Sequence, residues 1–92
     1  MDLNVYLEKA KAAIKVDSYN KLAQNVGITH AAVSNFLTGK AYPADNTILK
    51  LAALAGIPPE VALIDVSIWR NKNNPEALRF WENIRAKIAP EN

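Results

Sequence analysis

Apolar residues recur at steps of three and four positions along most of the chain, the spacing that gathers them on one face of an α-helix. Nowhere do apolar and polar residues alternate with period two over the length of a strand. The pattern predicts helices over about 3–16, 19–25, 30–38, 45–55, 59–72 and 75–88, followed by a frayed end at 90–92. The sequence therefore predicts an all-α fold, a bundle of about five helices plus a C-terminal helix.

Each predicted helix carries its own set of positions expected to be buried. In 3–16 these positions are Leu3, Tyr6, Leu7, Ala10, Ala13 and Ile14. In 45–55 they are Ile48, Leu49, Leu51, Ala52 and Leu54. In 59–72 they are Val61, Leu63, Ile64, Val66, Ile68 and Trp69. In 75–88 one stripe holds Leu78, Trp81, Ile84 and Ile88, with Phe80 beside it.

Residues 18–39 are predicted to form two short helices joined by a tight turn. Their apolar stripes are Leu22, Ala23 and Val26, then Ile28, Val33, Phe36 and Leu37. Gly27 lies between the helices, where a positive φ costs glycine little. Thr29 can cap the second helix with its hydroxyl, and Gly39 falls where a left-handed C-terminal cap belongs. Such a helix–turn–helix unit is a recurring motif of DNA-binding proteins.

The distribution of charge supports this interpretation more than the net charge of +2 does. Residues 1–57 carry 6 Lys and 4 acidic residues, whereas residues 58–92 carry 5 basic and 5 acidic residues. Between Ser18 and Ala44 there is no Asp or Glu. A helix–turn–helix with one acid-free side is typical of a protein that reads DNA.

Residue types that several other classes of protein need are missing. With no Cys, the chain offers no disulfide, no thiolate zinc site and no cysteine nucleophile. A single His, without an HExxH motif or a glycine-rich phosphate loop, argues against an enzyme, a metal site or a cofactor. Asp45 and Asp65 are interpreted as a helix cap and a surface residue. With no secretory signal and no bilayer-length apolar run, the expected location is the cytoplasm.

The run KLAQNVGITHAAVSNFLTGKAYP, residues 21–43, resembles the lambda-repressor-like, Cro/CI-type (XRE) family of helix–turn–helix regulators. The resemblance rests on Leu22-Ala23, Gly27-Ile28-Thr29, Val33-Ser34 and Gly39-Lys40, and it extends over about residues 4–57. KLAALAGIP, residues 50–58, is similar to the fourth helix of the family, and the tail is similar to that of small phage-associated members. One position departs from the family, because Tyr19 stands where a phosphate-contacting Gln is common.

The resemblance implies that the second helix of the motif enters the major groove of DNA. The positions that match the base readers of the family are His30, Ala31, Ser34 and Asn35. The expected phosphate contacts are Ser18, Tyr19, Lys21, Thr29, Thr38, Lys40 and Tyr42. Plainer roles stay open, since His30 and Asn35 can be ordinary exposed residues and Ser34 can bond its own backbone. Tyr42 can instead pack on Pro43, and Lys21 can be solvated.

The neutral tail, 58–92, holds both Trp residues and Phe80, and it is expected to form a helical hairpin on the 1–57 core within one compact domain. Trp69 is expected to belong to the core. Aromatic and aliphatic anchors dominate protein interfaces, so the predicted homodimer interface comprises Phe80, Trp81, Ile84 and Ile88. The alternative is that these side chains only complete the core.

The sequence thus predicts a dimeric, sequence-specific regulator of transcription that binds double-stranded DNA. The resemblance and the small size imply a phage or prophage repressor on a pseudo-palindromic operator, with no membrane or small-molecule partner. One alternative is a protein-binding module of the antitoxin or antirepressor type with the same fold. Another is a helix–turn–helix fold that has lost DNA binding.

Overall fold

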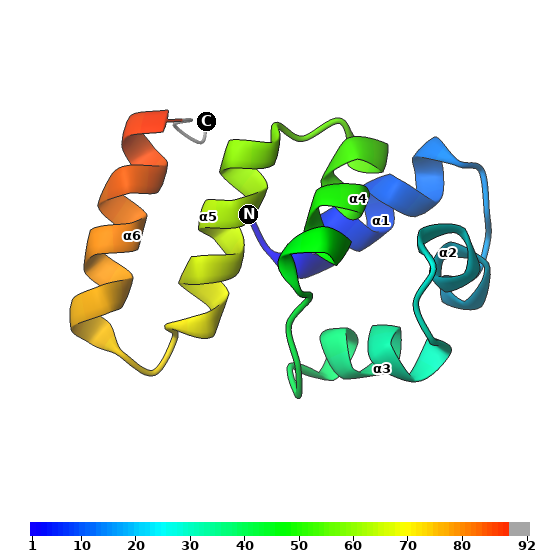
Figure 1. Cartoon of the computed structure of the whole chain (residues 1–92), viewed down its shortest axis with the longest axis horizontal. Coiled ribbons are helices and arrows are strands. Elements are labelled where there is room, and N and C mark those ends of the chain that lie inside the picture. The colour runs from blue at the N-terminus through cyan, green and yellow to red at the C-terminus, as the bar shows by residue number, and fades with distance from the viewer. Residues whose placement is uncertain (89–92) are drawn as a thin grey trace.

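The computed structural model describes residues 1–88, and the frayed end predicted at 90–92 lies outside them. Six α-helices and no strand occur in this range, which confirms the all-α prediction (Figure 1). Their bounds are α1 Leu3–Ala13, α2 Tyr19–Val26, α3 His30–Thr38, α4 Asp45–Ala55, α5 Pro59–Arg70 and α6 Pro75–Ile88. None of these helices combines the length and apolarity needed to cross a membrane.

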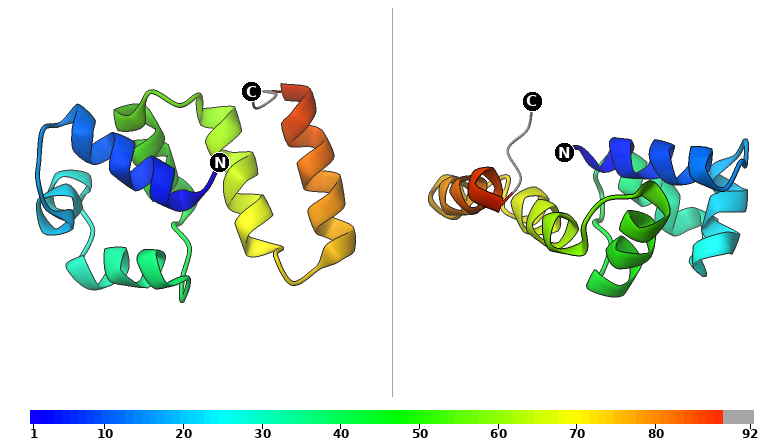
Figure 2. Two further views of the ribbon diagram at one scale, coloured as in Figure 1. Left: turned by 180° about the vertical axis from the view of Figure 1, so that it is seen from behind. Right: turned by 90° about the horizontal axis from the view of Figure 1, so that it is seen from above.

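The helices are arranged along the 37 Å long axis of the molecule. α1 and α4 pack on each other in the middle, and α2 and α3 lie at one end. α5 and α6 form an antiparallel pair at the other end, side by side in every view (Figure 2). Within the described residues, α6 packs on no helix other than α5. One side of α6 is therefore left without a helical neighbour.

The helix ends are fixed by side-chain caps and glycines at the positions that the sequence predicts. Ser18 Oγ accepts a hydrogen bond from Lys21 N at 3.2 Å, and Thr29 Oγ1 accepts one from Ala32 N at 3.0 Å. Gly27 and Gly39 end α2 and α3 with φ of 77° and 76°, a left-handed conformation that L side chains adopt at a cost. The turn between α2 and α3 is thus specified locally.

α1 ends three residues earlier than the predicted boundary at Val16. Lys15 has a φ of 58°, and Val16 N donates to Lys11 O at 3.2 Å, which closes the last turn as a left-handed C-terminal cap. This conformation is common for glycine and unusual for lysine, so the boundary could not be predicted from the residue type.

The core lies between α1, α2, α4 and α5, and most of the predicted stripes are in it. Its fully buried members include Tyr6, Leu7, Ala10, Leu22, Val33, Ile48, Leu51 and Val66. Trp69 packs against this cluster as predicted, with its ring 5.4 Å from that of Tyr6 in an edge-to-face contact. Outside α6, three predicted core positions are exposed instead: Ala13, Leu37 and Leu63. They lie at the edges of their stripes.

Asp65 is buried, with 1% of its surface exposed, so its interpretation as a surface residue was wrong. Its carboxylate accepts hydrogen bonds from Tyr6 Oη at 2.5 Å and from Arg85 Nε at 2.8 Å. The ammonium group of Met1 lies 3.3 Å away. Buried charge is costly unless it is paired and hydrogen-bonded, and these partners from α1 and α6 supply both. Asp65 thereby joins the first, fifth and sixth helices.

Asp45 does not cap α4, which corrects a second prediction. Ala44 occupies the N-cap position without a side-chain hydrogen bond, and Asp45 is the first residue of the helix. Arg70 at the end of α5 lies 3.8 Å from the Asp45 carboxylate and donates to Pro43 O at 3.0 Å. The segment that follows α3 is therefore held by the end of α5.

Candidate nucleic-acid interface

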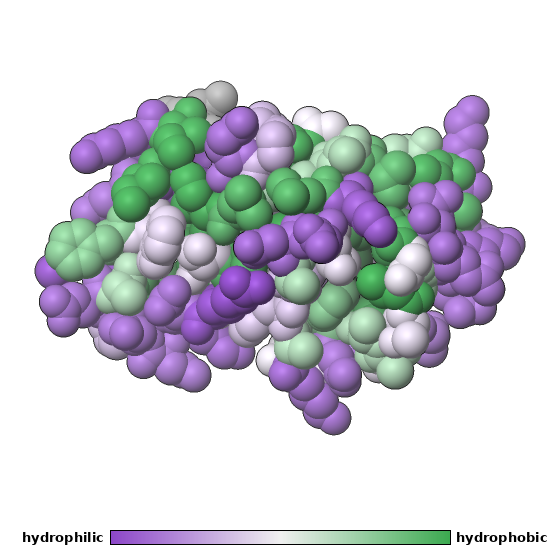
Figure 3. All heavy atoms as spheres, viewed as in Figure 1, coloured by the Kyte–Doolittle hydropathy of each residue, from purple (hydrophilic) through white to green (hydrophobic). Residues whose placement is uncertain are grey.

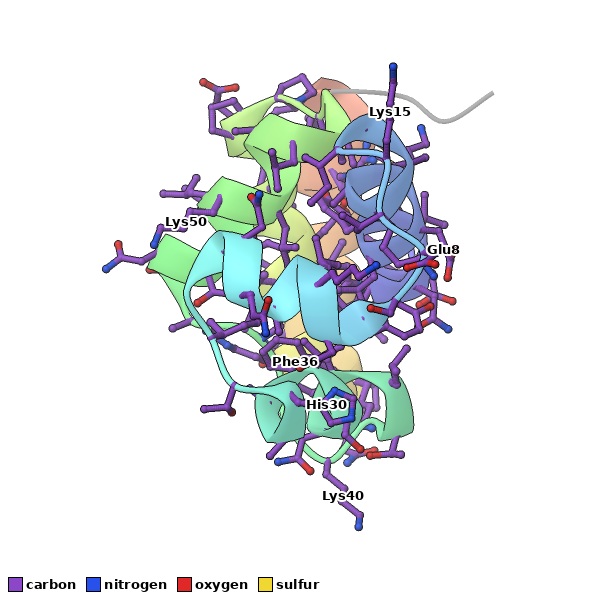
Figure 4. All side chains as sticks on the ribbon, turned by 90° about the vertical axis from the view of Figure 1, so that its right-hand side faces the viewer. Glu8, Lys15, His30, Phe36, Lys40 and Lys50 are labelled. Atoms are coloured by element: carbon purple, nitrogen blue, oxygen red, sulfur yellow. The ribbon has the colours of Figure 1, made fainter. Side chains whose placement is uncertain are left out.

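The nine residues of α3 lie along one edge of the molecule, at the bottom of Figure 1. Val33 and Phe36 are buried on its inner side, and Phe36 lies between α2 and α3 (Figure 4). The outer side is exposed and carries His30, Ala31, Ser34, Asn35, Leu37 and Thr38. α3 is thus supported from one side only, and the other side is open along the whole helix.

All four predicted base readers lie on this open side. His30 and Ala31 belong to the first turn, and Ser34 and Asn35 follow one turn later. The side chains of His30 and Asn35 form no hydrogen bond with another residue in 1–88, and His30 points away from the body of the protein (Figure 4). The structure brings the four residues together as one patch with free hydrogen-bonding groups.

The predicted phosphate contacts that carry a hydroxyl group differ in whether its hydrogen is still available for a hydrogen bond to a phosphate. Ser18 and Thr29 accept hydrogen bonds as caps, which leaves each O–H hydrogen available for a phosphate oxygen. Thr38 instead donates its hydrogen to the backbone, with Ser34 O at 3.1 Å and Asn35 O at 3.3 Å. Thr38 therefore suits a phosphate less well than the two caps do.

Tyr19 is already engaged by an acid that the sequence pattern does not associate with it. Its hydroxyl donates to the carboxylate of Glu8 on α1, and Lys11 Nζ lies 4.1 Å from the centre of its ring. The hydrogen bond from Tyr19 to Glu8 raises the pKa of Tyr19 to about 12. While this bond lasts, the hydroxyl has no hydrogen left to offer to a phosphate.

The side of the molecule that the sequence predicted to be acid-free is therefore not free of acids. Glu8 comes from another helix, and Asp17 stands one residue before the stretch that contains no acid. Lys21 Nζ lies 3.1 Å from Asp17 Oδ1, and its hydrogen bond and charge lower the pKa of Asp17. Carboxylates thus accompany two of the predicted phosphate contacts, at the beginning of α2.

Lys40 and Tyr42 follow α3 and lie in different surroundings. Lys40 is exposed, forms no ion pair with a described residue and extends away from the protein (Figure 4). Tyr42 is half-buried against the core, and Lys72 Nζ lies 5.4 Å from the centre of its ring. Lys40 is thus an exposed cation, without an ion-pair partner among the described residues, that follows directly after α3.

Sequence reasoning missed the residues that connect this patch to the rest of the molecule. Lys50 on α4 donates to Val26 O at 3.4 Å, at the end of α2, and Arg70 and Lys72 approach the segment after α3. A groove of about 500 Å³ runs between the end of α3 and the α5–α6 pair. Its lining includes Leu37 and Tyr42. No sequence signal links these positions, since tertiary packing alone brings them together.

No family model, curated protein or solved structure matches this chain in comparisons with each of these three groups. The resemblance to the Cro/CI-type regulators therefore stays a prediction from the sequence. In residues 1–88 no group of three or more His, Asp or Glu side chains could hold a metal ion. The open side of α3 carries the polar side chains of His30, Ser34 and Asn35, which form no side-chain hydrogen bond within residues 1–88.

Proposed function

We propose that this chain is a sequence-specific DNA-binding regulator of transcription with a lambda-repressor-like arrangement. In this proposal α2 and α3 form the helix–turn–helix, and α3 enters the major groove. The observation that carries it is the open side of α3, which presents His30, Ser34 and Asn35 at helical spacing without any carboxylate of its own. Such side chains form hydrogen bonds with base edges, and the groove is wide enough to admit a helix.

Phosphate contacts on both sides of α3 would hold the helix in register. The hydroxyls of Ser18 and Thr29 keep a hydrogen to donate, the first turn of α3 has free backbone N–H groups, and Lys40 follows the last turn of α3 and extends away from the protein. These groups are few, and Glu8 and Asp17 lie close to some of them. A single copy would therefore bind DNA weakly at physiological salt.

A homodimer would double these contacts and match a pseudo-palindromic operator. Its proposed interface is the α6 surface, which comprises Phe80, Trp81, Ile84 and Ile88. Phe80 is 57% exposed, Ile84 40% and Ile88 50%, and Figure 3 shows apolar side chains gathered over α6 and towards α5. Large apolar side chains exposed together mark interaction surfaces. By analogy with the resembling family, the dimer represses a phage or prophage promoter.

Selection of bound sequences from random duplex DNA tests this function directly. We expect a two-fold symmetric consensus, with an affinity that falls steeply as salt rises. Asn35→Ala should lose specific binding and relax the preference at one base pair, whereas Lys40→Ala should weaken binding to all duplexes alike. If no sequence is enriched, the chain does not read DNA.

A second function is favoured by the α6 surface alone. A protein-binding module of the antitoxin or antirepressor type would use Phe80, Ile84 and Ile88 to hold a different protein instead of a second copy. Sedimentation of the purified chain separates the two functions. A monomer that enriches no DNA sequence would favour the protein-binding module, and a dimer with a symmetric consensus would favour the regulator.

A further inference from the structure

The open side of α3 differs from that of a typical major-groove reader in the side chains it lacks. Residues 30–38 include no Arg, Lys, Asp or Glu. Arg or Lys paired with guanine O6 and N7 is the commonest base-specific contact in protein–DNA complexes, and a carboxylate is the usual acceptor for cytosine N4. α3 therefore lacks the side chains that select G·C pairs most strongly.

The side chains that are present suit A·T pairs. Asn35 can form two hydrogen bonds with adenine N6 and N7, a pairing that no other base offers in the major groove. Ala31 is exposed in the first turn of the same helix, one turn before Asn35. Apolar carbon on a reading helix matches the thymine methyl group, the apolar group that thymine presents in this groove.

Cations from neighbouring segments do not replace the missing arginine. Lys21 lies 3.1 Å from Asp17 at the beginning of α2, and Lys72 lies against the Tyr42 ring. Lys40 follows the left-handed Gly39 after the last turn of α3, and its side chain extends away from the protein, so a phosphate is its expected partner. His30 is the α3 side chain best suited to guanine, and it lies at the very start of the helix, whereas the Ser34 hydroxyl can bond to any base edge.

We infer that the half-site facing α3 is rich in A·T pairs, with Asn35 on an adenine and with Ala31 against a thymine methyl group. This inference rests on the proposed function. It allows one G·C pair, opposite His30. Specificity then comes from one amide and from an apolar contact, and the half-site is read without any basic side chain in the groove.

Replacement of thymine by uracil in the selected duplex tests the methyl contacts, because it removes one methyl group and leaves the base pairing unchanged. Each contacted thymine should cost about three- to fivefold in affinity, the size expected for one buried methyl group. Uracil placed outside the half-sites is the matched control and should have no effect. Affinities unchanged at every thymine of the half-sites would overturn the inference.

Exchange of the amide tests the other part of the inference. Asn35→Ala should cost about 5- to 150-fold on the selected duplex, and Asn35→Arg should move the preference at one base pair from A·T to G·C. Lys40→Ala is the control and should weaken A·T-rich and G·C-rich duplexes equally. A symmetric consensus with G·C pairs across the half-site would overturn this inference while the proposed function stands. No enriched sequence at all would overturn both.

Discussion

Asp65 is a charged residue in a buried position, although its residue type favours the surface. Its carboxylate is buried among apolar neighbours on α5 and depends on Tyr6 and Arg85 for hydrogen bonds. Arg85 is itself only 6% exposed. Removing either member of such a pair leaves the other charge buried without its counter-ion, which costs more than the pair contributes when intact.

Asp65→Ala should lower the free energy of unfolding by about 3–5 kcal/mol, since Arg85 would lose its buried carboxylate partner. Denaturation in urea measures this change. Asp45→Ala is the control, because the Asp45 side chain is 69% exposed and its ion pair should contribute less than about 1 kcal/mol. Equal effects of the two substitutions would show that Asp65 is not buried with its partners.

Lys15 is a residue whose backbone conformation favours a different amino acid. Lys15→Gly should raise the free energy of unfolding by about 0.5–1 kcal/mol, because relief of the left-handed strain exceeds the entropy that glycine loses on folding. Lys9→Gly, on the exposed side of α1, should instead lower it by about 1 kcal/mol. Thermal unfolding of the two variants compares the same exchange at two positions, and a loss of stability at both would contradict the left-handed assignment.

Tyr19 should titrate above the ordinary range of a tyrosine, since the hydrogen bond to Glu8 raises its pKa to about 12. The folded chain holds the neutral phenol, so the stabilising contribution is complete below about pH 10 and is lost as the pH rises towards 12. Ultraviolet titration of the phenolate measures this. Glu8→Gln should bring the Tyr19 pKa back towards its ordinary value, and an unchanged titration would remove Glu8 as the cause.

At the scale of elements, local interactions made most of the helices predictable. The N-terminal caps of α2 and α3 join residues three positions apart, and a glycine with a positive φ ends each helix. Both ends of these helices can therefore be predicted from the sequence. The contacts that were missed join distant residues. Tyr6 and Asp65 are 59 positions apart, and Glu8 and Tyr19 belong to different helices. Polar partners of this kind depend on packing between helices, which periodicity does not report.

The same distinction between local and long-range contacts applies to the candidate site. The exposure of His30, Ala31, Ser34 and Asn35 agrees with the helical period of α3. The acid next to Tyr19 and the contacts of Arg70 with the segment after α3 could not be derived, because they come from α1 and α5. The sequence pattern thus predicted which side of α3 is exposed. It did not predict which residues of other helices lie around that side.

Arg70→Ala should loosen the segment that follows α3. The substitution removes the hydrogen bond to Pro43 O and the ion pair with Asp45, which should cost about 1–2 kcal/mol. Hydrogen exchange of the backbone amides at 40–42 should become faster, while the amides of α1 keep their relative protection. Arg79→Ala, on the exposed side of α6, is the control. Equal exchange at 40–42 in both variants would show that Arg70 does not hold this segment.

At the scale of the whole molecule, the main unexplained feature is the exposed apolar side of α6. Packing of the hydrophobic core does not require these side chains to be apolar. α6 packs on α5 and leaves Phe80, Ile84 and Ile88 exposed. Ile84→Glu should shift a dimer towards monomer, because a buried charge in an apolar interface has no partner. Sedimentation at several concentrations measures this, and Asn83→Glu is the control on the same helix. A chain that is monomeric before substitution would exclude the homodimer.

The contacts of Asp65 also bear on the order in which the protein is made. Ribosomes add roughly 5–20 residues per second, and the domain folds as its segments emerge. Asp65 follows Tyr6 by 59 residues, and Arg85 comes 20 residues later still. The helix pair α2–α3 can therefore form early from local signals, whereas the buried carboxylate gains its guanidinium partner only after α6 has been made. Completion of this interior waits for α6 to leave the ribosome.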